Sequence, residues 1–208
     1  MSLESVRADL AARAPDLPII EVAESTATVA DAARALGVAP ARIAKTLAVR
    51  AGAETFLLVA RGDARLDNRK TKDRFGARPR MLGPEETLAL TGHPVGGVCP
   101  FGLATPLPVY CDLSLREFDI VYPAAGSLTS SVEVSPARLA ALVSSGWVDL
   151  CRIPEAGPGV GDAMSDEKKA ETEPPGEGES IEDAAREAVR EMEKRRDGQG
   201  HAGAGDIG

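Results

Sequence analysis

The chain has 208 residues, of which 43% are hydrophobic, and it carries a formal net charge of −8. This length favours one substantial domain with an appendage, and the apolar content is sufficient for a core. No apolar run approaches the roughly 18 residues of a transmembrane helix, and the N-terminus lacks the features of a signal peptide, so we expect a cytoplasmic protein without a membrane partner.

The predicted elements alternate along the chain between short helices and short strands. Helices are expected at 3–14, 28–37, 67–75, 84–90 and 136–145. Strands are expected at 19–24, 43–50, 55–61, 78–82, 107–112, 119–123, 131–135 and 147–153. Thr28 and Asp67 are predicted N-caps, and Gly37 and Gly76 are predicted to end the same two helices. The pattern indicates an α+β fold: a single domain, residues 1–153, with a curved, mostly antiparallel mixed sheet flanked by short helices.

Lys45 stands out in the strand at 43–50. Because side chains two apart share a face of a strand, Lys45 lies among the apolar residues Ile43, Leu47 and Val49. The opposite face carries Ala44, Thr46, Ala48 and Arg50, where a lysine that needs only water would sit. The ammonium must therefore reach a rim, a partner or a ligand, since an unpaired buried charge is costly. Extension past the edge of the sheet and a functional role both remain open at this point.

The segment 61–80 (RGDARLDNRKTKDRFGARPR) concentrates positive charge. It holds eight Arg or Lys residues against three Asp residues. Such a run is typical of a solvated helix face or of a surface that contacts a phosphate backbone.

The loop GHPVGGVCPFGLATPLP (92–108) is hard to explain as packing. The pair Gly96 and Gly97 removes two side chains, so backbone N–H groups could approach a ligand closely, although a hinge or bulge would use the same residues. The Gly spacings of phosphate- and dinucleotide-binding loops are absent. Cys99 with His93 is a weak candidate for nucleophilic catalysis, because no supporting acid is near in sequence.

The remaining cysteines and histidines argue against a metal centre. Cys99, Cys111 and Cys151 are widely spaced without a CxxC pair, and the chain has only two histidines. This usage suits a reducing compartment, and we predict no metal and no cofactor.

Residues 154–208 differ in composition from the rest of the chain. They hold 7 basic and 15 acidic residues, whereas residues 1–153 hold 17 of each, so the tail accounts for the whole net charge. We expect a largely disordered acidic tail. Within it, SIEDAAREAVREMEKRRD (180–197) is a predicted helix, either marginal and isolated or a docking peptide for a partner.

Three motifs in series resemble one family. They are Lys45 in a strand that follows a helix ending in LGV, the loop GGVCPFG near residue 100, and AAGSLTSSVEVSPARLAAL near residues 125–142. Together they resemble the YbaK/prolyl-tRNA synthetase-associated domain family, over roughly residues 1–153. These domains hydrolyse amino acids wrongly attached to tRNA, either within bacterial prolyl-tRNA synthetases or as freestanding proteins.

The resemblance implies roles for particular residues. Lys45 matches the family's functional lysine, which would bind the tRNA 3′-end or polarise the ester, and the amides of Gly96 and Gly97 would assist catalysis. Val98, Cys99 and Pro100 complete the GGxxP loop around the substrate, while Gly126, Ser130 and Ser131 form the opposite wall. Relatives usually carry Ser or Thr where this chain has Cys99, so no thiol chemistry is implied. The ribose hydroxyl of the tRNA itself is implied to assist the reaction.

The resemblance also implies a partner and leaves alternatives. We expect a freestanding aminoacyl-tRNA deacylase that acts on the acceptor end of a mischarged tRNA, with a small amino acid on tRNA for proline as substrate. The basic residues Arg69, Lys70, Lys72 and Arg74 are candidate contacts to the acceptor stem, and a synthetase is a candidate partner, whereas DNA is not expected. The alternatives are a non-catalytic module that binds tRNA or RNA, and a module that interacts with a synthetase.

Overall fold

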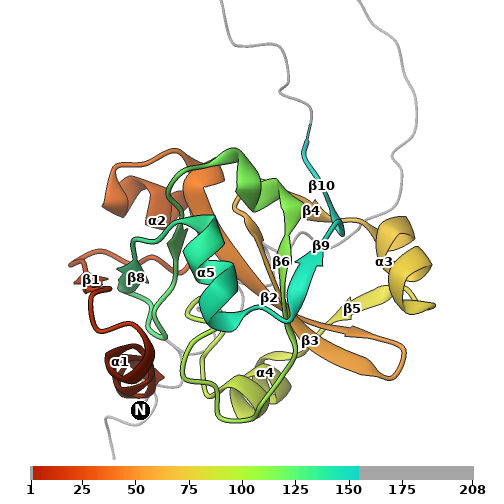
Figure 1. Ribbon diagram of the computed structural model, residues 1–208, viewed down its shortest axis with the longest axis horizontal. Helices are drawn as coiled ribbons and strands as arrows, with labels where there is room; N and C mark the ends of the chain where they lie inside the picture. Colours follow the sequence, from red (N-terminus) through yellow and green to blue (C-terminus); the bar gives the residue numbers. More distant parts are fainter. Residues whose placement is uncertain (1, 155–208) are drawn as a thin grey trace, which may run out of the picture.

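The structure is a computed structural model that describes residues 2–154 (Figure 1). The predicted acidic tail after Pro154, with its helix at 180–197, lies outside the described residues. None of the helices in the described part is long and apolar enough to cross a membrane. The α-helices are α1 (Ser2–Arg13), α2 (Val29–Leu36), α3 (Asn68–Phe75), α4 (Pro84–Thr91) and α5 (Pro136–Val143), and two 3₁₀ turns are η1 (Pro40–Arg42) and η2 (Leu113–Glu117).

The centre of the domain is a mixed sheet in the order β5-β2-β3-β6-β9, with β7 also paired to β2. Its strands are β2 (Ile43–Ala51), β3 (Glu54–Arg61), β5 (Pro79–Met81), β6 (Val109–Asp112), β7 (Tyr122–Pro123) and β9 (Gly146–Val148). Two antiparallel pairs stand apart from it: β1 (Ile19–Glu21) with β8 (Ser130–Val132), and β4 (Arg65–Leu66) with β10 (Cys151–Arg152). The predicted α+β fold with a mostly antiparallel mixed sheet is confirmed.

The hairpin of β2 and β3 is the framework of the sheet. The two strands pair antiparallel along their whole length, from Ala44 opposite Arg61 to Ala51 opposite Glu54, as the sequence predicts. Gly52 in the connecting turn has φ +63°, a conformation that L side chains rarely adopt. The hairpin therefore fixes the register of Lys45, which stands opposite Ala60.

Apolar clusters cover both faces of β2. Ala44 and Ala48 join the large cluster that includes α1, α5 and the loop after α4, while Leu47 and Val49 pack with Phe56 on the other side. The interpretation of the even-numbered face as the one facing water is thus wrong, because Ala44 and Ala48 are buried. Their small side chains leave room for the segments that pack over them.

The prediction of a single closing strand at 147–153 is also wrong, because this segment forms two strands, β9 and β10. β9 pairs with β6, whereas β10 turns away and pairs with β4. The bend is held by the buried carboxylate of Asp112, which accepts hydrogen bonds from the amides of Leu150 (2.8 Å) and Cys151 (3.1 Å). A carboxylate that satisfies two amides outside the ladder stabilises such a corner.

Candidate functional site

A cavity of about 490 Å³ lies along β2. Residues before and within α2, the first half of β2, the β5–α4 connection, the loop at 95–98 and β8 all contribute to its wall. The cavity therefore collects segments that are more than 100 residues apart in the chain.

The cavity follows an unpaired stretch of β2. On this edge β7 pairs with Ile43 and Ala44, and β5 pairs with residues 49–51, so the residues between them have no partner strand there. The carbonyl of Ala48 points to this edge and accepts from the amide of Leu82 at 3.0 Å. Because backbone groups alternate in direction along a strand, the amide and carbonyl of Thr46 point to the same edge. Peptide groups of β2 are thus presented at the cavity.

Lys45 lines the cavity, and its ammonium group has partners in the protein. The Nζ atom donates to the carbonyl oxygen of Gly62 at 2.9 Å and also to that of Ala64, both in the turn after β3. Lys45 is half-buried and does not simply extend past the sheet into water. These two carbonyls hold the positive charge of Lys45 at the cavity wall, so the ammonium group reaches partners within the protein.

The two glycines of the loop have different local roles. The amide of Gly97 donates to the carbonyl of Pro94 at 2.9 Å, closing a turn in which Gly96 has φ +91°. A positive φ at the third position of such a turn favours glycine. Since the Gly97 amide is used in this turn, the amides of Gly96 and Val98 are the better placed donors: both residues line the cavity, and neither amide donates to another described residue.

The same glycines allow the loop to pack against the segment at 126–131. A Cβ on Gly97 would lie 3.1 Å from the backbone carbon of Ser127, and one on Gly96 would lie 3.1 Å from Cδ2 of Leu128. This contact places Ser130 and Ser131 in the cavity wall beside Gly96. The Ser131 hydroxyl donates to the carbonyl of Pro123 at 2.8 Å.

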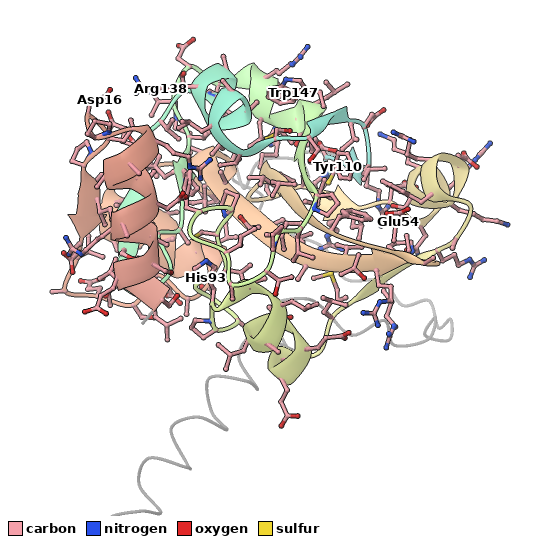
Figure 2. All side chains as sticks on the ribbon, turned by 60° about the horizontal axis from the view of Figure 1, so that its bottom comes forward. Asp16, Glu54, His93, Tyr110, Arg138 and Trp147 are labelled. Atoms are coloured by element: carbon pink, nitrogen blue, oxygen red, sulfur yellow. The ribbon has the colours of Figure 1, made fainter. Side chains whose placement is uncertain are left out.

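Four predicted site residues are not among those that line the cavity: Gly97, Cys99, Pro100 and Gly126. The Cys99 thiol is fully buried, 3.6 Å from Nε2 of His93, and burial raises its pKa to about 12. His93 is also fully buried, between α1 and the end of α4 (Figure 2), and burial lowers its pKa. A protonated thiol beside a neutral, inaccessible imidazole does not form a nucleophile.

Gly126 has a structural contact instead. It has φ +85°, and a Cβ there would lie 2.8 Å from the carbonyl oxygen of Ser2 in α1. The glycine therefore allows α1 to pack closely on the segment that leads into the cavity wall.

The basic residues of α3 lie away from the cavity. None of Arg69, Lys70, Lys72 and Arg74 lines it, and α3 stands at the end of the domain opposite β1 and β8 (Figure 1). Lys70 is bound to the Asp149 carboxylate and to the Cys151 carbonyl, at 2.6 Å each, and the bond with Asp149 raises its pKa. These four residues are therefore not brought together with Lys45.

Sequence reasoning missed most of the cavity lining, including Arg80, Thr26 and Thr46. Arg80, on β5, is the last residue of the basic segment, so the charge count includes it but does not separate it from the residues of α3. The hydroxyl oxygens of Thr26 and Thr46 are buried and have no hydrogen-bond partner among the described residues. No sequence signal identifies them, because an ordinary threonine in a loop (Thr26) or a strand (Thr46) looks the same.

The lining of the cavity restricts its chemistry. Among the described residues that form it there is no Asp, Glu, His or Cys, while hydroxyls come from four threonines, two serines and Tyr122. Residues 2–154 also contain no cluster of three such side chains suited to hold a metal ion. The arrangement offers positive charge and hydrogen-bond donors but no side-chain general base.

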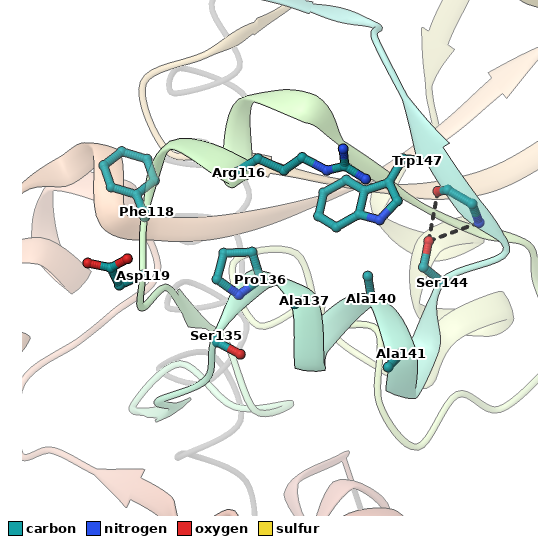
Figure 3. Close-up of a pocket in the computed structure, with 11 residues that line it drawn as sticks. Arg116, Phe118, Asp119, Ser135, Pro136, Ala137, Ala140, Ala141, Ser144 and Trp147 are labelled. Carbon is teal, nitrogen blue, oxygen red and sulfur yellow. Dashed lines mark hydrogen bonds between the residues drawn. The ribbon is translucent and has the colours of Figure 1, made fainter.

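A second, more open depression of about 730 Å³ lies between η2, α5 and β9 (Figure 3). There the guanidinium of Arg116 lies 4.3 Å above the ring of Trp147, beside the small side chains of α5. Of the three motifs only the end of the third reaches it, through Ser135, Pro136 and alanines of α5, and none of the predicted site residues lines it. The smaller cavity on β2 is the candidate site, because it is the one that unites the motifs.

Comparisons with known proteins identify the family of the chain. A family model described as "Aminoacyl-tRNA editing domain" matches residues 23–142. The protein YwhH of Bacillus subtilis (strain 168), which is uncharacterized, is 46% identical over 154 residues, covering 73% of this chain and 98% of that protein. A proline–tRNA ligase of Moorella thermoacetica is 38% identical over 100 residues, which span 47% of this chain and only 17% of the ligase. The crystal structure of "a putative trans-editing enzyme for prolyl tRNA synthetase" matches with a TM-score of 0.68 at 34% identity, covering 73% of this chain and 97% of that chain.

Proposed function

The chain belongs to the family of aminoacyl-tRNA editing domains, and from this premise we propose that it hydrolyses the ester bond of a mischarged aminoacyl-tRNA. The observation that carries the proposal is the meeting of Lys45, Gly96, Val98, Ser130 and Ser131 in one cavity. The proposed substrate is a small amino acid on tRNA for proline, in keeping with the similarity to segments of proline–tRNA ligases.

In the proposed reaction a water molecule attacks the carbonyl carbon of the ester. The bond to the ribose oxygen then breaks, the amino acid leaves as a carboxylic acid, and a proton passes to the ribose oxygen. The negative charge that develops on the carbonyl oxygen would be stabilised by the Lys45 ammonium and by the amides of Gly96 and Val98.

The proton transfers need a separate agent, because the cavity lining supplies no carboxylate or imidazole in the described residues. The neighbouring hydroxyl of the terminal ribose is the group in the substrate that can relay them. An aminoacyl ester is already activated, so positioning and electrostatic stabilisation can suffice without a strong side-chain base.

The test is release of amino acid from alanyl-, seryl- and cysteinyl-tRNA for proline by the unaltered protein and by Lys45→Met. The variant keeps most of the aliphatic stem and removes the charge. We expect hydrolysis of at least one ester and a loss of about 100-fold or more in the variant, a magnitude typical of removing one electrostatic contact to a developing oxyanion. Binding of uncharged tRNA by both proteins is the control for folding.

A non-catalytic module that binds tRNA is the second candidate, and the lack of a side-chain base in the lining favours it. It predicts tRNA binding without hydrolysis of any ester in the panel. Association with a synthetase is a further proposal, tested by deletion of residues 155–208: lost association with retained hydrolysis would place the contact in that segment.

A further inference from the structure

The cavity carries positive charge without an opposing carboxylate in its described lining. Its two cations are Lys45 and Arg80. The Lys45 ammonium donates to backbone carbonyls, as described above. Arg80, in contrast, is exposed, and its side chain makes no ion pair or hydrogen bond with any other described residue. An exposed residue that also lines the cavity lies at its mouth.

The surroundings of Arg80 supply no structural reason for its charge. Arg50 is its direct cross-strand partner in the ladder of β2 and β5, so the two guanidinium groups project from the same face. The nearby carboxylate of Glu86 is already paired with Arg50 at 2.5 Å. Like charges directly opposite one another destabilise a ladder, and an anionic ligand would offset that cost for Arg80.

Arg61, in the same basic segment, is neutralised within the protein. Its guanidinium group is bound by Asp63 at 2.6 Å and by Glu117 at 2.5 Å. Arg80 therefore differs from Arg61 both in its lack of a carboxylate partner and in its place on the cavity wall.

The chemistry of the proposed substrate places an anion at this position, and the inference rests on the proposed function. In an aminoacyl-tRNA the acyl group is esterified to the ribose of the terminal nucleotide, and the nearest phosphate is attached to the other end of the same ribose. With the acyl group inside the cavity, this phosphate lies outside it, at the mouth. We infer that Arg80 binds the phosphate of the terminal nucleotide, through paired N–H donors of its guanidinium group.

The experiment compares two RNA minihelices with the acceptor stem of tRNA for proline. One ends in the complete CCA, and the other lacks the terminal nucleotide and hence its phosphate. The Kd of each is measured at two salt concentrations for the unaltered protein, for Arg80→Ala and for Arg78→Ala. Arg78 is the matched control, because it is an exposed arginine two residues away that makes no described contact and does not line the cavity.

We expect Arg80→Ala to bind the complete minihelix about tenfold more weakly, the typical effect of a charge-assisted hydrogen bond. The slope of log Kd against the logarithm of the salt concentration should be smaller for this variant than for the unaltered protein, by about 0.7 to 1. On the shortened minihelix, Arg80→Ala and the unaltered protein should have equal Kd values. Any effect of Arg78→Ala should be the same on both RNAs.

Equal affinity of Arg80→Ala and the unaltered protein for the complete minihelix would overturn the inference, and so would an equal loss on both RNAs. Hydrolysis of aminoacyl-tRNA by the unaltered protein, measured in parallel, separates the two proposals. Hydrolysis together with either of these results refutes the role of Arg80 alone. Failure of the unaltered protein both to bind the minihelix and to hydrolyse any ester refutes the proposed function and this inference together. Thermal denaturation should give Arg80→Ala a Tm no lower than that of the unaltered protein, since no described contact is lost.

Discussion

Gly62 is the residue at which a single methyl group should damage both the fold and the site. It is buried where the turn after β3 meets η1, and an added Cβ would lie 2.2 Å from the carbonyl oxygen of Pro40 and 2.6 Å from Cγ1 of Val29. The first atom belongs to the backbone and cannot rotate away, so the turn itself must move. Overpacking of this kind typically lowers the free energy of unfolding by about 1–3 kcal/mol. Because the clash is with a backbone atom, we expect a loss of about 3 kcal/mol for Gly62→Ala. The Tm should then fall by about 6–12 °C in a domain of this size.

The same movement should displace an acceptor of the Lys45 ammonium, because the carbonyl of Gly62 holds Nζ at 2.9 Å. Ester hydrolysis by Gly62→Ala should therefore be reduced even at temperatures where circular dichroism shows the variant to be folded. Gly83→Ala is the control: its φ is −65°, an added Cβ would meet nothing within 4 Å, and the change of an N-cap glycine should cost less than about 1 kcal/mol. Equal Tm values for the two variants would refute the argument from packing.

Three further predictions concern buried polar groups. Thr46→Val should raise the free energy of unfolding by about 1 kcal/mol, because it removes a buried hydroxyl without a described partner, whereas Thr71→Val should lower it, because that hydroxyl donates to the carbonyl of Asp67. Urea denaturation should show that the free energy of unfolding decreases as the pH falls below about 6.5. Burial lowers the pKa of His93 in the folded state, so the unfolded chain takes up the proton first. A His93→Gln variant should lose this pH-dependent contribution. Iodoacetamide should leave Cys99 unmodified and hydrolysis unchanged until denaturant is added, given a fully buried thiol with a pKa of about 12.

The ends of helices were predictable because their signals lie within one turn of chain. The Thr28 side chain accepts from the amide of Asp31, and the Asp67 side chain accepts from the amides of Arg69 and Lys70, so both predicted N-caps are confirmed. Gly37 and Gly76 adopt the left-handed conformation that ends α2 and α3. Each of these features depends on residues two to four apart.

Contacts between distant segments were not predictable in the same way. The break between β9 and β10 depends on Asp112, which lies 38 residues before Leu150, whose amide donates to its carboxylate. Composition locates positive charge in the segment 61–80, but only the pairing of β5 with β2 shows that Arg80 borders the cavity. Through family resemblance, the three motifs indicate which segments belong to the site. Only the turn at Pro94 shows which amides of the loop remain available to a ligand, because it uses the amide of Gly97.

Two prolines explain why β2 keeps an unpaired stretch beside Lys45. β7 ends at Pro123, which lies opposite Ala44 and has no N–H to continue the ladder along β2. From the other side β5 ends at Met81, and Pro84 begins α4 and turns the chain away from the sheet. Since neither strand can extend, the peptide groups around Thr46 stay open toward the cavity, and a lysine one position earlier is anchored by the carbonyls of the β3 turn. The binding surface thus arises where strand pairing stops, so that the same prolines that shorten two strands also create the space for a ligand.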